Sequence, residues 1–172
     1  MPRSRLLATL GVVVLLAAVG TASWLRRGRA QSATELLPYQ ARVGLLPSTE
    51  QERFAQVSAA IRQAEAGRAT NKAWPSTLGV PGLTWVQRGK GLYVNYLGIP
   101  AEPEQLRWLV LLIEPEPSAI KDKAPPEDEQ HHTLSDGTPI HVSVWTAANQ
   151  GAVPEVVLPF PAAEDWIQRL SP

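Results

Sequence analysis

The sequence of 172 residues contains no cysteine. This absence excludes disulfide bonds, thiolate zinc sites, cysteine nucleophiles and N-terminal lipoprotein attachment. A chain of this length can bury an adequate core without covalent cross-links, and it has room for one domain once an anchor is set aside.

Acidic residues are missing from residues 1–29, which carry five arginines. The formal charge of the whole chain is zero, so the remainder, with 11 basic and 16 acidic side chains, carries a net charge of −5. A phosphate backbone would repel such a domain, and we therefore expect no binding to nucleic acid.

Charged residues are also missing from residues 6–25, which read LLATLGVVVLLAAVGTASWL. As a helix this run reaches ~30 Å, the thickness of the bilayer hydrocarbon core. Trp24 lies where an interfacial aromatic residue is expected, and arginines follow it. We predict a membrane anchor over residues 1–29, with a transmembrane helix at 6–25 that contacts the lipid bilayer. The alternative is a cleaved signal peptide, because Gly20 and Ala22 fit a small-x-small cleavage site.

The orientation follows from the sizes of the two flanks. A short N-terminal tail before a large C-terminal domain usually stays in the cytoplasm. We expect a single-pass protein of the inner (cytoplasmic) membrane, with its C-terminal domain in the periplasm.

Residues 30–47 are predicted to be a tether, and residues 48–172 a soluble α+β domain. A helix is expected to begin at the capping box Thr49-x-x-Glu52 and to stop at Gly67. Its apolar face is defined at helical spacing by Phe54, Val57, Ile61 and Ala64.

Strand patterns follow the helix. Residues 83–88 and 92–97 alternate with period two and predict a hairpin. The continuous apolar run 106–113 predicts a central strand covered on both faces. Residues 114–130 are rich in proline and acid, and we interpret them as a mobile surface loop.

A second hairpin is predicted from residues 131–134 and 139–145, with Asp136-Gly137 as a two-residue turn. The end of the chain, 162–170, is predicted to form a short C-terminal helix. The expected fold is therefore α+β: an N-terminal transmembrane helix, then one amphipathic helix packed on an antiparallel sheet of about five strands.

The second hairpin also carries the candidate metal site. With Asp136 and Gly137 as the only turn residues, His132 pairs with His141 and both project from one face of the sheet, with Cβ atoms ~5 Å apart. Two neutral imidazoles at that spacing can share Zn²⁺. Glu129 is the expected third ligand, with Asp128 or a partner protein as alternatives. The competing hypothesis is a polar strand pair with exposed histidines.

The order of a hydrophobic N-terminal helix, a second helix and an antiparallel sheet is similar in topology to type IV pilins and pseudopilins. Those proteins carry a glutamate inside the apolar run, and residues 6–25 contain none. The similarity concerns topology alone, and no functional residue of those families is assigned to a position in this sequence.

Four short motifs lie between residues 74 and 145: WP at 74–75, GLY at 91–93, YLG at 96–98 and VSVW at 142–145. This stretch resembles uncharacterised single-span bacterial envelope proteins, some of which are encoded beside zinc or manganese ABC transporters. The resemblance implies an envelope location and favours metal chemistry.

The chain has no G-x-S-x-G, P-loop or G-x-G-x-x-G motif. We therefore expect a non-enzymatic, membrane-tethered accessory or scaffold protein of the bacterial envelope, whose domain binds another envelope protein. The alternative is a low-affinity metal-binding or metal-delivery accessory protein that uses His132 and His141.

Overall fold

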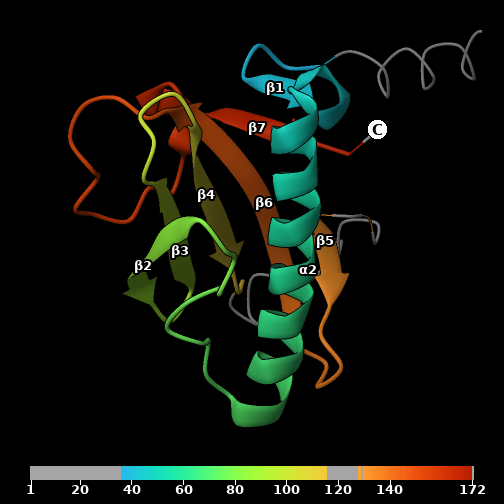
Figure 1. Cartoon of the computed structure of the whole chain (residues 1–172). Coiled ribbons are helices and arrows are strands. Elements are labelled where there is room, and N and C mark those ends of the chain that lie inside the picture. The colour runs from blue at the N-terminus through green and yellow to red at the C-terminus, as the bar shows by residue number, and fades with distance from the viewer. Residues whose placement is uncertain (1–35, 116–127, 129, 172) are drawn as a thin grey trace, which may run out of the picture. The chain divides into compact units, whose positions relative to one another are not determined.

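The computed structural model describes residues 36–115, 128 and 130–171 (Figure 1). The predicted membrane span, residues 6–25, lies outside this part of the chain. Among the helices that the structure describes, none is long and apolar enough to cross a membrane. The domain is α+β, with one long helix packed on a mostly antiparallel sheet.

The chain divides into two units, Met1–Leu37 and Pro38–Pro172. Every described helix and strand belongs to the second unit. This unit begins inside the predicted tether, 30–47, which contributes a short strand and the 3-10 helix η1 (Val43–Leu45) to the fold.

The long helix, α2 (Ser48–Asn71), presents the apolar face that the sequence predicted. Val57, Ile61 and Ala64 are buried, and Phe54 packs against the same cluster. Burial of such a face supplies most of the stability of a helix in a protein, because the hydrophobic gain exceeds what intrinsic propensity provides.

Both ends of α2 differ from the predicted ends. Pro47 occupies the N-cap position, and no side chain caps the helix there, so Thr49 lies within the first turn and the predicted capping box is not formed. At the other end the helix continues through Gly67 and stops where Lys72 adopts a left-handed conformation with a φ of 58°. The additional turn buries Ala69, which explains why a single glycine does not end the helix.

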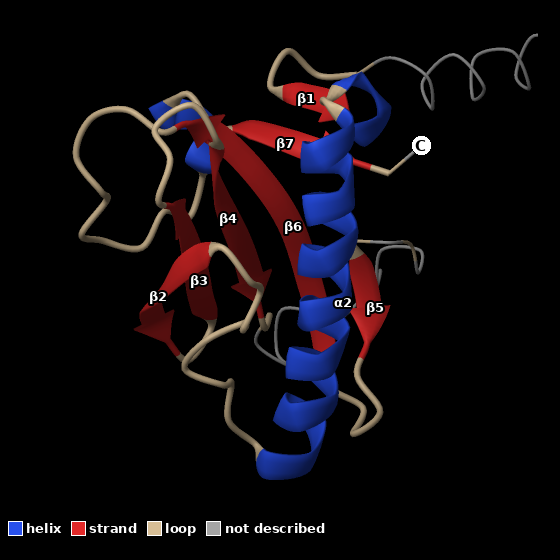
Figure 2. Ribbon diagram, in the orientation of Figure 1, coloured by secondary structure: helices blue, strands red, loops and turns tan. Residues whose placement is uncertain are grey.

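Seven strands form one sheet in the order β1-β7-β6-β4-β3-β2, and β5 pairs with β6 off this path. The pairs are antiparallel except for β1 and β7, which are parallel. Figure 2 shows α2 running along one face of the sheet. The strands are β1 (Gln40–Arg42), β2 (Leu83–Lys90), β3 (Tyr93–Pro100), β4 (Leu106–Ile113), β5 (His131–Thr133), β6 (Pro139–Ala148) and β7 (Ile167–Leu170).

The predicted C-terminal helix over 162–170 is wrong. Only the 3-10 helix η3 (Pro161–Glu164) forms, and β7 follows it. Trp166 and Gln168 are both buried, and their spacing of two residues is the period with which a strand repeats one face. The backbone N–H of Gln168 donates to the carbonyl of Tyr39 at 2.7 Å, so pairing with β1 and β6 outweighs the helical pattern of this short segment.

The predicted central strand is confirmed as β4, which is buried on both faces. Trp108, Val110 and Leu112 face α2, whereas Leu109 and Leu111 join the cluster on the opposite face. All five side chains are at most 3% exposed. Each such burial contributes roughly 1.5–3 kcal/mol, so the strand requires a cover on both sides.

The segment after β6 covers the face opposite to α2. Leu158 and Trp166 are buried there against Leu97 and Trp145. The Oδ1 atom of the buried Asn95 accepts the backbone N–H of Leu158 at 2.6 Å, and this bond fixes the covering segment to β3.

A bidentate ion pair joins the end of α2 to the end of β4. The Nε and Nη2 atoms of Arg68 donate to the two carboxylate oxygens of Glu114 at 2.8 and 2.7 Å. Trp74 Nε1 donates to the same carboxylate at 2.6 Å. The hydrogen bond with Glu114 raises the pKa of Arg68. Glu114 thus belongs to the folded domain and not to the predicted acidic loop, 114–130, of which residues 116–127 and 129 lie outside the described residues.

Two glycines provide a matched test of this packing. A Cβ atom added at Gly98, in the middle of β3, would lie 2.8 Å from the ring of Trp85 on β2. We expect Gly98→Ala to destabilise the domain by about 1–3 kcal/mol, because the indole must move. Gly67→Ala, where nothing lies within 4 Å, should stabilise it by about 0.5–1 kcal/mol. Urea denaturation of the full-length chain in mild detergent, followed by tryptophan fluorescence, measures both. Equal changes in the two variants would contradict the packing described.

Candidate functional site

The hairpin between β5 and β6 turns through three residues, not two. The backbone N–H of Leu134 donates to the carbonyl of Thr138 at 2.8 Å, so these two residues close the loop. Ser135, Asp136 and Gly137 lie between them, and Gly137 has a φ of +88°. A glycine in this conformation at the third loop position is typical of three-residue hairpins, and it accounts for the register.

The predicted pairing of His132 with His141 is therefore wrong by one residue. His131 lies opposite His141, and His132 lies opposite Ile140. A shift of one residue moves every side chain of a strand to the other face, so the two histidines of the predicted metal site are on opposite faces of the sheet. Glu129, the third predicted ligand, lies outside the described residues.

Asp136 holds this turn in place. Its carboxylate accepts a bond from Lys72 Nζ at 2.7 Å and another from the backbone N–H of Thr138 at 3.0 Å. The bond from Lys72 is the main cause that lowers the pKa of Asp136 well below its ordinary value. The residue that ends α2 is thus also the residue that positions the hairpin loop.

His132 faces α2, where its Nε2 atom lies 3.2 Å from Oε1 of Glu65. The Glu65 side chain is 13% exposed and that of His132 30%. Burial raises the pKa of Glu65, and the neighbouring His132 opposes this shift. The pair is therefore a polar contact that the fold keeps at the boundary between helix and sheet.

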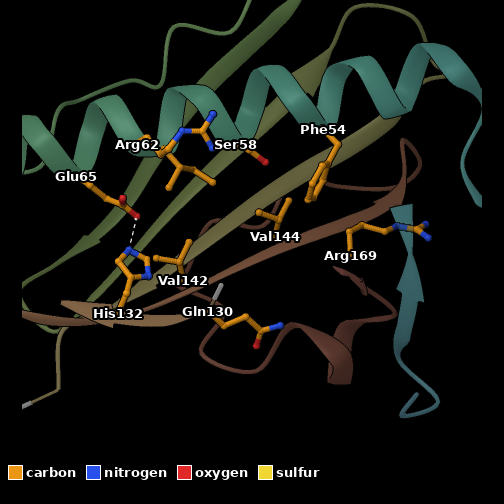
Figure 3. Close-up of a pocket in the computed structure, with 10 residues that line it drawn as sticks. Phe54, Ser58, Arg62, Glu65, Gln130, His132, Val142, Val144 and Arg169 are labelled. Atoms are coloured by element: carbon orange, nitrogen blue, oxygen red, sulfur yellow. Dashed lines mark hydrogen bonds and ion pairs between the residues drawn. The ribbon is translucent and has the colours of Figure 1, made fainter. Parts of the chain in front are cut away.

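The Glu65–His132 pair lines a cavity of about 360 Å³ between α2 and the strands β5, β6 and β7. Figure 3 shows Glu65 and His132 at one end of this cavity and Phe54 and Arg169 at the other. The lining combines four apolar side chains with six polar or charged ones: Phe54, Ser58, Ile61, Arg62, Glu65, Gln130, His132, Val142, Val144 and Arg169. We call this space the helix–sheet cavity.

Arg169 gives the helix–sheet cavity its most unusual charge. The side chain is half-buried, and burial lowers its pKa, although a guanidinium stays protonated in proteins. Its Nε atom donates to the hydroxyl of Thr146 at 2.7 Å. Within the described residues it forms no ion pair with a carboxylate. The exposed Arg62 adds a second positive charge from the helix.

The opposite face of the hairpin brings the other two histidines together. Nε2 of His131 and Nδ1 of His141 lie 2.8 Å apart, with ring centroids separated by 4.4 Å. Nδ1 of His131 lies 3.0 Å from Oδ1 of Asp128. Burial, together with the nearby His131, lowers the pKa of His141. Partial burial raises the pKa of Asp128, but bonds from the backbone N–H groups of His131 and Gln130 outweigh it and leave that pKa below its usual value.

The helix–sheet cavity places a carboxylate, an imidazole and a hydroxyl beside apolar side chains. A carboxylate that orients a histidine activates a nucleophile when a hydroxyl is hydrogen-bonded to the same ring. In the part of the chain that the structure describes, no such bond joins Ser58 to His132. A lining that mixes apolar and polar side chains is suited to an amphipathic ligand.

Sequence analysis did not single out the polar residues of the helix–sheet cavity. Ser58, Arg62 and Glu65 recur at helical spacing beside the predicted apolar face, so their common direction was available from the sequence. Arg169 lies within the segment predicted as a helix, 162–170, so the sequence did not place it on a strand beside the cavity.

The described residues thus form an α+β domain with an amphipathic cavity on one side of a hairpin and a histidine pair on the other. Within residues 36–115, 128 and 130–171, no group of three or more histidine, aspartate or glutamate side chains is arranged to hold a metal ion. Comparisons of the chain with protein-family models, with curated proteins and with solved structures find no match.

Glu65 makes the stability of the domain depend on pH. Folding raises the pKa of Glu65 above its ordinary value of 4.5. The contribution of Glu65 to the free energy of unfolding is therefore fully present below about pH 4.5, and it is lost as the pH rises through the pKa of the folded state. We expect Glu65→Gln to remove that loss, so the variant should gain stability over the wild type as pH rises from 4 to 8. Urea denaturation at several pH values measures the difference. Glu52→Gln, an exposed carboxylate on the same helix, is the control and should stay close to the wild type throughout.

Proposed function

We propose that this chain is a membrane-anchored, non-enzymatic accessory protein of a bacterial envelope whose domain binds a partner protein through the helix–sheet cavity. The observation that carries the proposal is the half-buried Arg169 at one end of the helix–sheet cavity, which makes no ion pair with a carboxylate among the described residues. A buried charge is costly unless it is paired, and a partner that supplies the missing anion gains affinity from it.

The chemistry of the lining defines the occupant. Val142, Val144 and Ile61 suit aliphatic side chains, while a guanidinium favours a carboxylate, which it can bind with two parallel hydrogen bonds. A volume of about 360 Å³ is at the lower end for ligand pockets, and it accommodates one or two side chains. The occupant is accordingly a short apolar segment of a partner protein that carries a carboxylate.

Charge supports this choice over nucleic acid. The chain beyond residue 29 carries a net charge of −5, whereas the helix–sheet cavity sets two arginines against the single carboxylate of Glu65 and is therefore a local positive region. Such a region attracts an isolated carboxylate but not a polyanion. The apolar run 6–25 supplies the anchor, and the domain lies in the periplasm.

The anchor is tested by fractionation of cells that carry the full-length chain with alkaline phosphatase fused to its C-terminus. We expect the fusion to remain in the membrane pellet after carbonate extraction and to be active, because the enzyme folds only outside the cytoplasm. Deletion of residues 6–25 should release an inactive fusion into the soluble fraction. A soluble full-length fusion would refute the anchor, and an inactive membrane-bound one would refute the orientation.

The helix–sheet cavity is tested with an N-acetylated tripeptide of alanine, valine and leucine that ends in a free carboxylate. We expect it to shift the resonances of Val142 and Val144 in spectra of the isotope-labelled full-length chain in detergent. The same peptide with a C-terminal amide should bind about tenfold more weakly, because it lacks the group that pairs with Arg169.

Substitutions separate this explanation from unspecific apolar binding. In Arg169→Gln, the acid and the amide should bind equally weakly. Arg42→Gln, an exposed arginine on β1, should retain the preference for the acid. Equal affinity of the wild type for the acid and the amide, or shifts outside the helix–sheet cavity, would refute the proposed binding mode.

A further inference from the structure

We infer that His131 and His141 form a binding site for a divalent transition metal, with Zn²⁺ as the reference ion, on the face of the hairpin opposite to the helix–sheet cavity. The site is independent of the proposed function, since neither ring lines the cavity. It also differs from the site predicted from the sequence, because His132 has no part in it.

The two ring nitrogens converge on one point. Nε2 of His131 and Nδ1 of His141 are 2.8 Å apart, and the rings are tilted by 50°. Two imidazoles that ligate one Zn²⁺ at ~2.05 Å in tetrahedral geometry have nitrogens about 3.3 Å apart. Small rotations of the two side chains therefore open the existing contact to a ligating distance without a change in strand register.

The tautomers favour ligation. Asp128 accepts from Nδ1 of His131, so the neutral ring carries its proton there and leaves the Nε2 lone pair directed at His141. Without a metal, Nδ1 of His141 must then be the donor in the contact between the rings. When a metal enters, neutral His141 shifts that proton to Nε2 by exchange with solvent, and both lone pairs face the ion.

Asp128 has the position of an outer-shell residue. A carboxylate that holds the second nitrogen of a ligating histidine fixes its tautomer and raises its basicity, an arrangement common in zinc sites. The same carboxylate oxygen accepts the backbone N–H groups of Gln130 and His131 at 2.8 and 2.7 Å, so it is itself held in place. Asp128 thus holds the ring of His131 in position, and two surface histidines without such a carboxylate would not be held.

The location leaves room for the other ligands. The side chain of His131 is 33% exposed and that of Asp128 is 54% exposed, so solvent reaches the metal position. Water molecules complete the coordination, as they do at open zinc sites. With two protein ligands the affinity is expected in the micromolar range.

The experiment is a titration of the full-length chain, in detergent and a non-chelating buffer, with ZnCl₂ in a calorimeter. One Zn²⁺ should bind per chain, and His131→Gln and His141→Gln should each weaken binding at least tenfold. His132→Gln is the matched control: it changes the adjacent residue of the same strand, whose ring faces α2, and it should remain within about twofold of the wild type. Asp128→Asn should weaken binding about tenfold.

Nitrogen-15 spectra of the imidazole rings give a second readout that needs no variant. Zn²⁺ should shift Nε2 of His131 and Nδ1 of His141 and leave both nitrogens of His132 unchanged. The inference is overturned if the wild type gives no saturable heat, if His132→Gln weakens binding as much as His131→Gln, or if the zinc-dependent shifts fall on other nitrogens. None of these results would affect the test of the helix–sheet cavity, which uses a peptide and Arg169.

Discussion

The fold depends on the burial of β4 from both sides. From Trp108 to Leu112 its side chains alternate between two apolar clusters and none of them is charged, so a sheet built on it is stable only when both faces are covered. α2 provides one cover through a narrow stripe of aliphatic and alanine residues. The segment between β6 and β7 provides the other, held by the bond between Asn95 and Leu158. The cavity arises on the helix side, where α2 passes over β6.

Those parts of the fold that repeat a strong pattern could be predicted from the sequence. The apolar run of β4 and the helical spacing of Val57 and Ile61 appear in the structure as expected. The hairpin of β2 and β3 also forms, but β2 continues to Lys90, β3 runs from Tyr93 to Pro100, and β3 is buried on both faces instead of with period two. The pieces that were missed are short. β1 and β7 contain three and four residues, too few to show a period, and they form strands because they pair with each other and with β6. Tertiary pairing of this kind leaves no local signal.

The candidate site could be predicted only in part. Val142 and Val144 lie on the face of β6 that packs toward α2 and His141 lies on the other, a separation that follows from the period of two without knowledge of the turn. The partner of His141 depended on whether the loop holds two or three residues. Asp136 and Gly137 fit both loop lengths, and in the structure the three-residue loop is accompanied by a contact of Asp136 with Lys72, which lies 64 positions earlier in the chain. The local sequence therefore could not decide which histidine faces which side.

The position of β2 at the end of the sheet has a consequence for self-association. This strand spans eight residues, and along its outer side it pairs with no other strand among those described. Unpaired backbone groups on a flat edge can template the addition of a further extended chain. Gly89, with a φ of +74°, interrupts the extended conformation near the end of β2 and shortens the flat stretch to the residues before it. At high concentration, intermolecular pairing should therefore begin at residues 83–88, and a charged or proline substitution on that outer edge would oppose it.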